Sequence, residues 1–148
     1  VPHSVYDVWM HSNEAFNPSY RDKRSWFLKP DEQHWSKDPV RDPWFLLRKE
    51  HLEESNMMST DEQLAWLKAS HPYCRIAEPK HVTYGQALCS KVHPSLRLYK
   101  GFNYPRTLIQ PQMGGNFVCV WTDDQGLRLC DYSGKAINGV NAPILWTA

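Results

Sequence analysis

The sequence predicts an α+β fold with an extended N-terminal arm rich in aromatic residues and Pro, a small helical pair, and a C-terminal antiparallel β-meander. Three observations predict it. Residues 1–40 lack a sustained hydrophobic period, helix-capping patterns recur in residues 41–100, and two apolar runs flank a turn within residues 101–148. We therefore divide the chain into an extended arm (1–40), a helical region (41–100), and a linker with a β-hairpin or meander and an apolar tail (101–148).

Composition bounds the class of protein. At 148 residues the chain is long enough for one domain with a core of its own. Hydrophobic residues make up 41%, and the seven Trp, seven Tyr and five Phe add apolar surface, since each aromatic side chain buries about 150–250 Å². No apolar run reaches the ~18–20 residues of a membrane span. We therefore expect a chain with no membrane span of its own.

The N-terminal arm carries its apolar residues in clumps, separated by turn signals such as Asn17-Pro18-Ser19. A free segment of this composition would be poorly soluble, so its aromatic side chains are expected to dock on a surface. We expect that surface to belong to a neighbouring protein, because the rest of the chain offers little core to cover. The predicted partner-binding anchors, one of them in the C-terminal tail, are Trp9, Trp26, Phe27, Trp35 and Trp146.

The helical region begins with cap signals. Asp42-Pro43 places a good N-cap before a Pro at the first helical position, which predicts a helix over 44–54. Ser59-x-x-Glu62 is a capping box and predicts a second helix over about 60–69. Two helices joined by so short a break are expected to lie antiparallel.

Residues 47–67 combine a charged helix, a Ser-containing break at Ser55–Met58 and a Ser-x-Asp-Glu cap at Ser59–Glu62. In this order of features the stretch resembles the soluble helical pair of cytochrome c oxidase subunit IV. The resemblance covers 21 of the 148 residues and implies a subunit of a respiratory complex. The membrane helix that follows in that family has no counterpart in this sequence.

A further helix is predicted after residue 83, where Thr83-x-x-Gln86 is another capping box. The apolar residues that follow recur at helical spacing and form a stripe that needs a surface to cover; they are Tyr84, Ala87, Leu88 and Val92. Ser95–Tyr99 alternates weakly and is expected to be a strand.

The C-terminal part predicts a hairpin. Two apolar runs flank Asp123–Gly126, and pairing Thr122 with Leu127 places Cys119 opposite Cys130. The two cysteines are either a cross-strand disulfide, in an oxidising compartment, or two small hydrophobic side chains in a sheet. The apolar run 144–146 is expected to form a last strand or a docking tail.

Two Cys–His pairs form a candidate zinc site. The pairs His71-x2-Cys74 and Cys89-x3-His93 have the close spacing that structural zinc sites use. The alternative is that the thiols are half-buried and the histidines lie on the surface or cap helices.

A cysteine-dependent enzyme is a further alternative, with Cys74 or Cys89 beside His71, His81 or His93. No nucleophile elbow, P-loop or dinucleotide fingerprint accompanies these residues, so we expect no enzyme.

Nucleic-acid binding is supported by the charge of residues 71–100, where five cations against one carboxylate give +4. The net charge of the whole chain is only +1, which argues against it.

These features favour a non-catalytic accessory subunit of a large organellar assembly, with a mitochondrial respiratory-chain or ATP-synthase complex as the expected setting. Its partners are expected to be other protein subunits, because interfaces are enriched in Trp, Tyr and Met. The first residue is Val1 rather than Met, so either a targeting peptide has been removed, as we expect for a mitochondrial protein, or the chain is trimmed. We expect no cofactor, with zinc as the alternative. A zinc-stabilised or RNA-contacting protein of a ribosome-like assembly is the second hypothesis.

Overall fold

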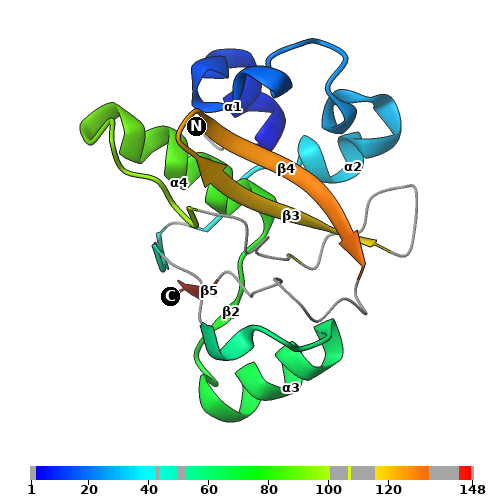
Figure 1. Ribbon diagram of the computed structural model, residues 1–148, viewed down its shortest axis with the longest axis vertical. Helices are drawn as coiled ribbons and strands as arrows, with labels where there is room; N and C mark the ends of the chain where they lie inside the picture. Colours follow the sequence, from blue (N-terminus) through cyan, green and yellow to red (C-terminus); the bar gives the residue numbers. More distant parts are fainter. Residues whose placement is uncertain are drawn as a thin grey trace.

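A long β-hairpin lies at the centre of the computed structural model, which describes residues 3–42, 44–49, 53–100, 107, 116–133 and 144–147. Figure 1 shows α1, α2 and α4 grouped around this hairpin and α3 at the opposite end of the molecule. The predicted α+β class with a C-terminal hairpin is confirmed. None of the helices in the described part of the chain has the length and hydropathy that a membrane span requires.

The hairpin consists of β3 (Asn116–Asp123) and β4 (Gly126–Ser133). Its register is the predicted one, with Cys119 opposite Cys130 and Thr122 opposite Leu127. Both faces are buried. Val118, Val120, Leu127 and Leu129 are inaccessible on one face, and Cys119 and Trp121 are buried on the other. A two-stranded sheet that is covered on both sides needs other elements of the chain to pack against it.

The N-terminal segment provides part of this cover and is not an extended arm. It folds into α1 (Val5–His11), α2 (Gln33–Ser36) and four short 3-10 helices, at Asn13–Ala15, Pro18–Tyr20, Trp26–Leu28 and Pro30–Glu32. The Asn17 N–H donates to the Leu127 carbonyl (2.9 Å), and the Trp26 indole donates to the Leu129 carbonyl (3.1 Å). The expected docking on a neighbouring protein is therefore corrected: the segment packs on the core of its own chain.

The predicted helix over 44–54 is wrong. Residues Phe45–Leu47 form strand β1, and Glu53–Ser55 form a short 3-10 helix. β1 pairs antiparallel with β5 (Ile144–Thr147), and the other edge of β5 pairs with β2 (Arg75–Ile76). The apolar run at 44–47 fits a strand as well as a helix, and its strand partner lies at the far end of the chain. β5 therefore does not pair with the hairpin. In place of the predicted meander, the described strands form a two-stranded hairpin and a separate sheet of order β1-β5-β2.

The second predicted helix is confirmed as α3 (Thr60–Ser70), with the Ser59–Glu62 capping box formed. α4 (Pro79–Val92) begins four residues before the predicted capping box at Thr83. It starts there because Glu78 and His81 cap it and Pro79 occupies the first helical position.

The apolar stripe predicted for α4 is buried only in part. Val82, Thr83, Gln86 and Ala87 are buried, whereas Leu88 and Val92 are exposed. Ser95–Tyr99 is a loop and not a strand. The Gln86 side chain holds this loop, because it donates to the Leu96 carbonyl (2.9 Å) and accepts from the Leu98 N–H (2.8 Å).

One hydrophobic core draws on all three predicted segments, with Val5 and Phe27 from the first, Val82 from the second and Leu129 from the third. The predicted linker at 101–115, apart from Thr107, lies outside the described residues. So does the side chain of Trp146.

Candidate functional site

The structure does not bring the two halves of the predicted zinc site together. His71 ends α3, where its ring packs against Trp66 (centroids 5.2 Å apart), and Cys74 follows three residues later. Cys89 and His93 belong to the end of α4. Figure 1 shows these helix ends in different parts of the molecule. Within the described residues, no three His, Cys, Asp or Glu side chains are placed to hold one metal ion.

The structure also shows where the other predicted cysteine residues lie. Cys119 and Cys130 face each other across the hairpin, as the register predicts, and are not joined in a disulfide. His81 is inaccessible and hydrogen-bonded to Asp42, so its ring is committed and is not available to activate Cys89.

The predicted tryptophan anchors belong to the core rather than to an open surface. The Trp9 indole donates to the Tyr20 carbonyl (2.8 Å), and the Trp35 indole donates to the Glu32 carboxylate (2.7 Å). Phe27 is inaccessible, and the half-buried Trp26 packs on the same cluster. Trp9, Phe27 and Trp35 are already covered by their own chain, so they are not open partner anchors, whereas the assignment of Trp26 and Trp146 stays a prediction.

Asp42, which the sequence places at a helix N-cap, instead connects two segments. The His81 Nδ1 atom accepts from the Glu78 backbone N–H (3.2 Å), so the ring proton is on Nε2, which donates to the Asp42 Oδ2 atom (2.8 Å). The other Asp42 oxygen accepts from Arg75 (3.0 Å). Lys80 forms a second tie, to Asp38. Together these contacts fix residues 38–42 beside the start of α4.

The same contacts set the charge states. Burial lowers the pKa of His81, and this effect outweighs the opposing influence of the Asp42 carboxylate. Burial raises the pKa of Asp42, but the hydrogen bond from His81 and the charge of Arg75 hold it below its usual value. His81 is therefore a neutral hydrogen-bond donor to a carboxylate anion.

We predict that stability falls when the pH is lowered from 7.0 to 5.5. The unfolded chain protonates His81 near its ordinary pKa of 6.5, whereas the folded chain resists protonation there. The unfolded state then binds more protons, and the folded state loses on the order of 1 kcal/mol per pH unit below 6.5. Urea unfolding at the two pH values measures the loss. His81→Gln, which cannot titrate, should show a smaller one, and an equal loss in both proteins contradicts the assignment.

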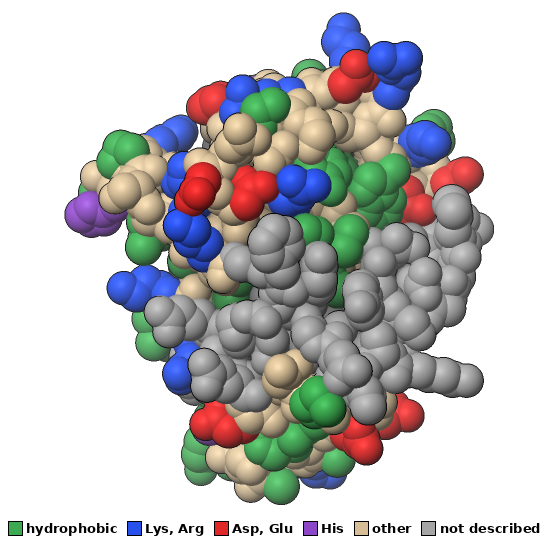
Figure 2. All heavy atoms as spheres, viewed as in Figure 1, with side chains coloured by type: hydrophobic (Ala, Val, Ile, Leu, Met, Phe, Trp, Pro, Cys, Tyr) green, Lys and Arg blue, Asp and Glu red, His purple; other side chains and the backbone are tan. Residues whose placement is uncertain are grey.

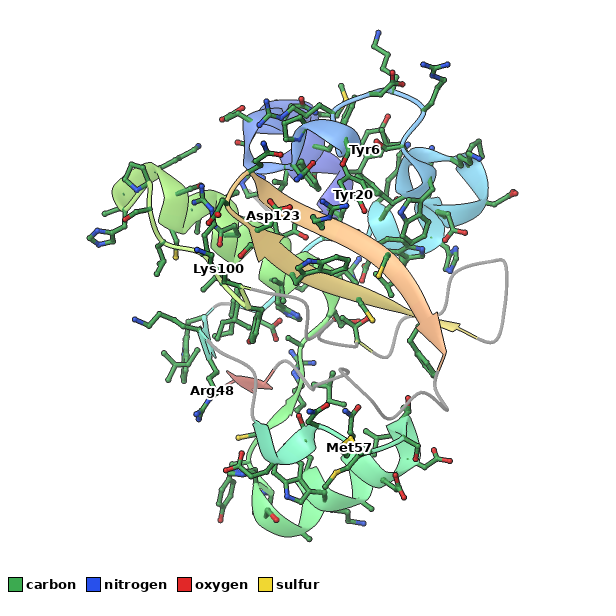
Figure 3. The ribbon with its side chains drawn as sticks, in the orientation of Figure 1. Tyr6, Tyr20, Arg48, Met57, Lys100 and Asp123 are labelled. Carbon is green, nitrogen blue, oxygen red and sulfur yellow. The ribbon has the colours of Figure 1, made fainter. Side chains whose placement is uncertain are left out.

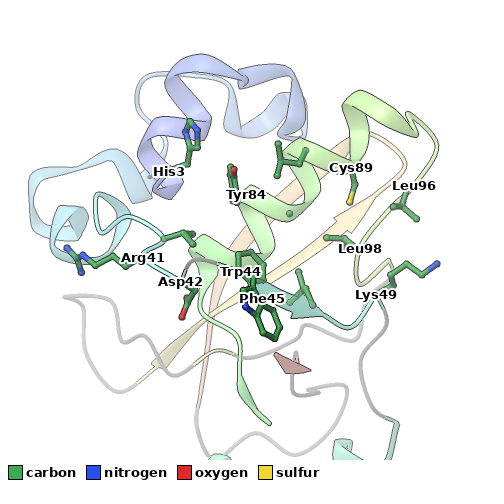
Figure 4. A pocket seen from close by; sticks show the side chains of 14 residues that line it. His3, Arg41, Asp42, Trp44, Phe45, Lys49, Tyr84, Cys89, Leu96 and Leu98 are labelled. Atoms are coloured by element: carbon green, nitrogen blue, oxygen red, sulfur yellow. The ribbon is translucent and has the colours of Figure 1, made fainter. Parts of the chain in front are cut away.

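An apolar groove lies beside this tie, between α4 and β1 (Figure 4). Its volume is about 710 Å³, within the range of roughly 300–1,000 Å³ typical of ligand pockets. Tyr84, Leu88 and Cys89 of α4 form one wall, and Trp44 and Phe45 face them. Leu47 and Leu98 pack against α4 at Gly85, where an added Cβ would lie 3.2 and 3.4 Å from their methyl groups.

Large apolar side chains remain accessible at this groove. Trp44 is 54% exposed and Leu88 is 47% exposed. Leu46 of β1 and Val92 of α4 do not line the groove but are also exposed. Accessible apolar clusters of this kind mark binding sites in monomeric proteins. The stripe through Tyr84, Leu88 and Val92 is the sequence signal for the α4 wall of the groove. For the facing wall, at Trp44 and Phe45, the sequence predicts a helix.

The groove has a basic residue at each end. Figure 4 shows Arg41 and Asp42 at one end and Lys49 at the other. The Arg41 guanidinium donates to Asp38 (2.9 Å), and Asp42 is held by His81 and Arg75. Lys49 makes no ion pair within the described part of the chain. The groove can therefore bind an apolar group and place a negative charge beside Lys49.

No family model, curated protein or solved structure matches this chain.

Proposed function

We propose that this chain is a non-catalytic protein-binding subunit that holds a segment of another protein in the groove between α4 and β1. The observation that carries the proposal is the pair of half-exposed apolar walls, formed by Trp44 and by Leu88. Interface cores are rich in aromatic residues, and a single buried anchor often carries much of the binding energy. Val92 lies one helical turn beyond Leu88 and is exposed as well, which suits a macromolecular partner better than a small ligand.

The finer proposal is an accessory subunit of a large organellar assembly, with a mitochondrial respiratory-chain or ATP-synthase complex as its setting. The aromatic-rich composition and the near-neutral net charge of +1 support it. The groove supplies the partner site that the core tryptophans do not.

The RNA-binding alternative loses support from the side chains of the basic segment. Arg75 and Lys80 pair with Asp42 and Asp38, and Lys100 pairs with Asp124. Figure 2 shows cations and carboxylates interspersed on the visible face. RNA binding needs cations that can neutralise phosphates and so displace the counterions of the RNA. These three cations already have carboxylate partners.

The test is the size of the species that contains the full chain in its own mitochondria, measured by native gel electrophoresis. The native chain should migrate in a large complex, and Leu88→Glu should shift it to the free form, with binding weakened at least ~30-fold, as for a hot spot of about 2 kcal/mol. Because Leu88 is half exposed, the variant should fold normally by circular dichroism.

Tyr73→Glu is the matched control. Tyr73 is 89% exposed and lies in the turn after α3, outside the groove. This variant should stay in the complex. Migration of the native chain only as a monomer, or equal migration of Leu88→Glu and native chains in the complex, overturns the proposal.

A further inference from the structure

We infer that the groove receives an amphipathic helix of the partner and that this helix carries acidic residues beside its apolar face, at the Lys49 end. The inference rests on the proposed function and names the partner segment. Three features of the groove support it: the geometry of its α4 wall, the short length of β1, and the charges around its rim.

The α4 wall has the form that helices pack against. Tyr84, Leu88 and Val92 are spaced four residues apart and make one ridge along α4. Helices pack by setting such ridges into the grooves of a facing helix, with axes about 8–10 Å apart. The His3 ring stacks on Tyr84 (5.0 Å between centroids) and supports the start of this ridge. Leu88 and Val92 are exposed, so a partner helix can pack against them.

A partner strand has less to bind. β1 is three residues long, and one of its edges is already paired with β5. Just beyond its end, the Lys49 carbonyl accepts a hydrogen bond from the Tyr99 N–H (2.9 Å), so the loop before Tyr99 lies alongside. Strand addition relies on a run of open backbone groups. A helix that uses side-chain contacts suits this site better.

The rim charge selects an acidic partner. Three carboxylates and four cations line the groove or belong to its tie to α4, which gives 4 − 3 = +1. They are Asp38, Asp42, Glu78, Arg41, Lys49, Arg75 and Lys80. The carboxylates are engaged by Arg41, Arg75, Lys80 and His81.

Lys49 is the lining cation that makes no ion pair within the described residues. It lies at the end of the groove in Figure 4, whereas Arg48, which does not line the groove, lies at the edge of the molecule in Figure 3. Opposite charges across an interface steer binding, and like charges exclude wrong partners. A carboxylate on the flank of the bound helix would meet Lys49, whereas a basic helix would be repelled.

The experiment places the photo-cross-linking residue p-benzoylphenylalanine at position 88 of the full chain in its native complex, and identifies the captured segment by mass spectrometry. We expect a segment with apolar residues three and four apart and with Asp or Glu on the flank. Lys49→Glu should reduce the cross-link yield at least tenfold. Reversal of the partner's acidic residue to Lys in the Lys49→Glu background should restore the yield.

Lys91→Glu is the matched charge control, since Lys91 is exposed on α4 and does not line the groove. Its yield should match that of the native chain. The effect of Lys49→Glu should be larger at low salt than at high salt. A basic or strand-forming captured segment, or a yield indifferent to Lys49→Glu, overturns this inference and leaves the proposed function standing. Capture of no protein from position 88 overturns both.

Discussion

Replacing Phe27 by Ala will lower the free energy of unfolding by about 3–5 kcal/mol, the usual cost of removing a buried phenyl ring. Phe27 is fully inaccessible and stacks on Phe16, with ring centroids 5.6 Å apart. Trp26 meets the same ring edge-on at 6.1 Å. The loss is a large share of the ~5–15 kcal/mol that stabilises a typical domain, so the variant should be partly unfolded at moderate temperature.

Urea denaturation of the full chain measures this change, with Met10→Ala as the control. Met10 is 55% exposed on α1, so its truncation should cost less than about 0.5 kcal/mol. The comparison tests whether residues 1–40 belong to the core of their own chain. Similar small effects for the two variants would mean that this segment packs elsewhere.

Replacing Gly126 by Ala is the second large effect, and we expect a loss of about 1–3 kcal/mol or more from backbone strain alone. Gly126 opens β4 with φ of +128°, a conformation that L side chains rarely adopt. An added Cβ would lie 2.6 Å from the Ala15 carbonyl oxygen and 2.8 Å from the Phe16 carbonyl carbon. Both are backbone atoms, so the N-terminal segment must shift away from the hairpin.

Gly85→Ala is the matched control, because it makes the same substitution within α4. Its Cβ would meet the side chains of Leu47 and Leu98, which can adjust, and Ala favours a helix over Gly by up to about 1 kcal/mol. We expect Gly85→Ala to be close to neutral. Hydrogen exchange adds a local measurement: Gly126→Ala should expose the Asn17 amide, which bonds to the Leu127 carbonyl. Unchanged protection at Asn17 contradicts this account.

The parts of the fold that the sequence predicts correctly depend on neighbours along the chain. The hairpin register follows from the turn at Asp123–Gly126 and the runs on either side. α3 follows from the capping box at Ser59. The predictions that fail depend on distant residues. The run at Phe45–Leu47 becomes a strand because residues 145–147 pair with it.

The N-terminal segment was assigned to a neighbouring protein for the same reason. A local pattern does not show that the hairpin is buried on both faces, and so does not show that it needs Phe16 and Phe27 as cover. The segment also lacks a period because its 3-10 turns are too short to produce one.

Only one of the two walls of the candidate site could be predicted from the sequence. The stripe through Leu88 and Val92 indicated a surface that needs cover, and these residues are exposed on α4. The facing wall could not be found, because Trp44 belonged to a predicted helix. The zinc prediction relied on spacing within two pairs, which says nothing about the distance between them. The sequence predicts that Asp42 caps a helix, whereas in the structure its carboxylate binds His81 and Arg75.

The position of β5 in the middle of its sheet has a consequence for biosynthesis. β1 and β2 do not pair with each other, and each finds its partner in residues 144–147. The aromatic rings of the N-terminal segment likewise pack against the hairpin at 116–133, which is synthesised later. Until residues 116–147 have been synthesised, the segment that precedes them has no complete core on which to collapse. We expect this core to form only after those residues have left the ribosome, and to form slowly, as in proteins dominated by contacts between distant residues, with the apolar segments held by chaperones until then.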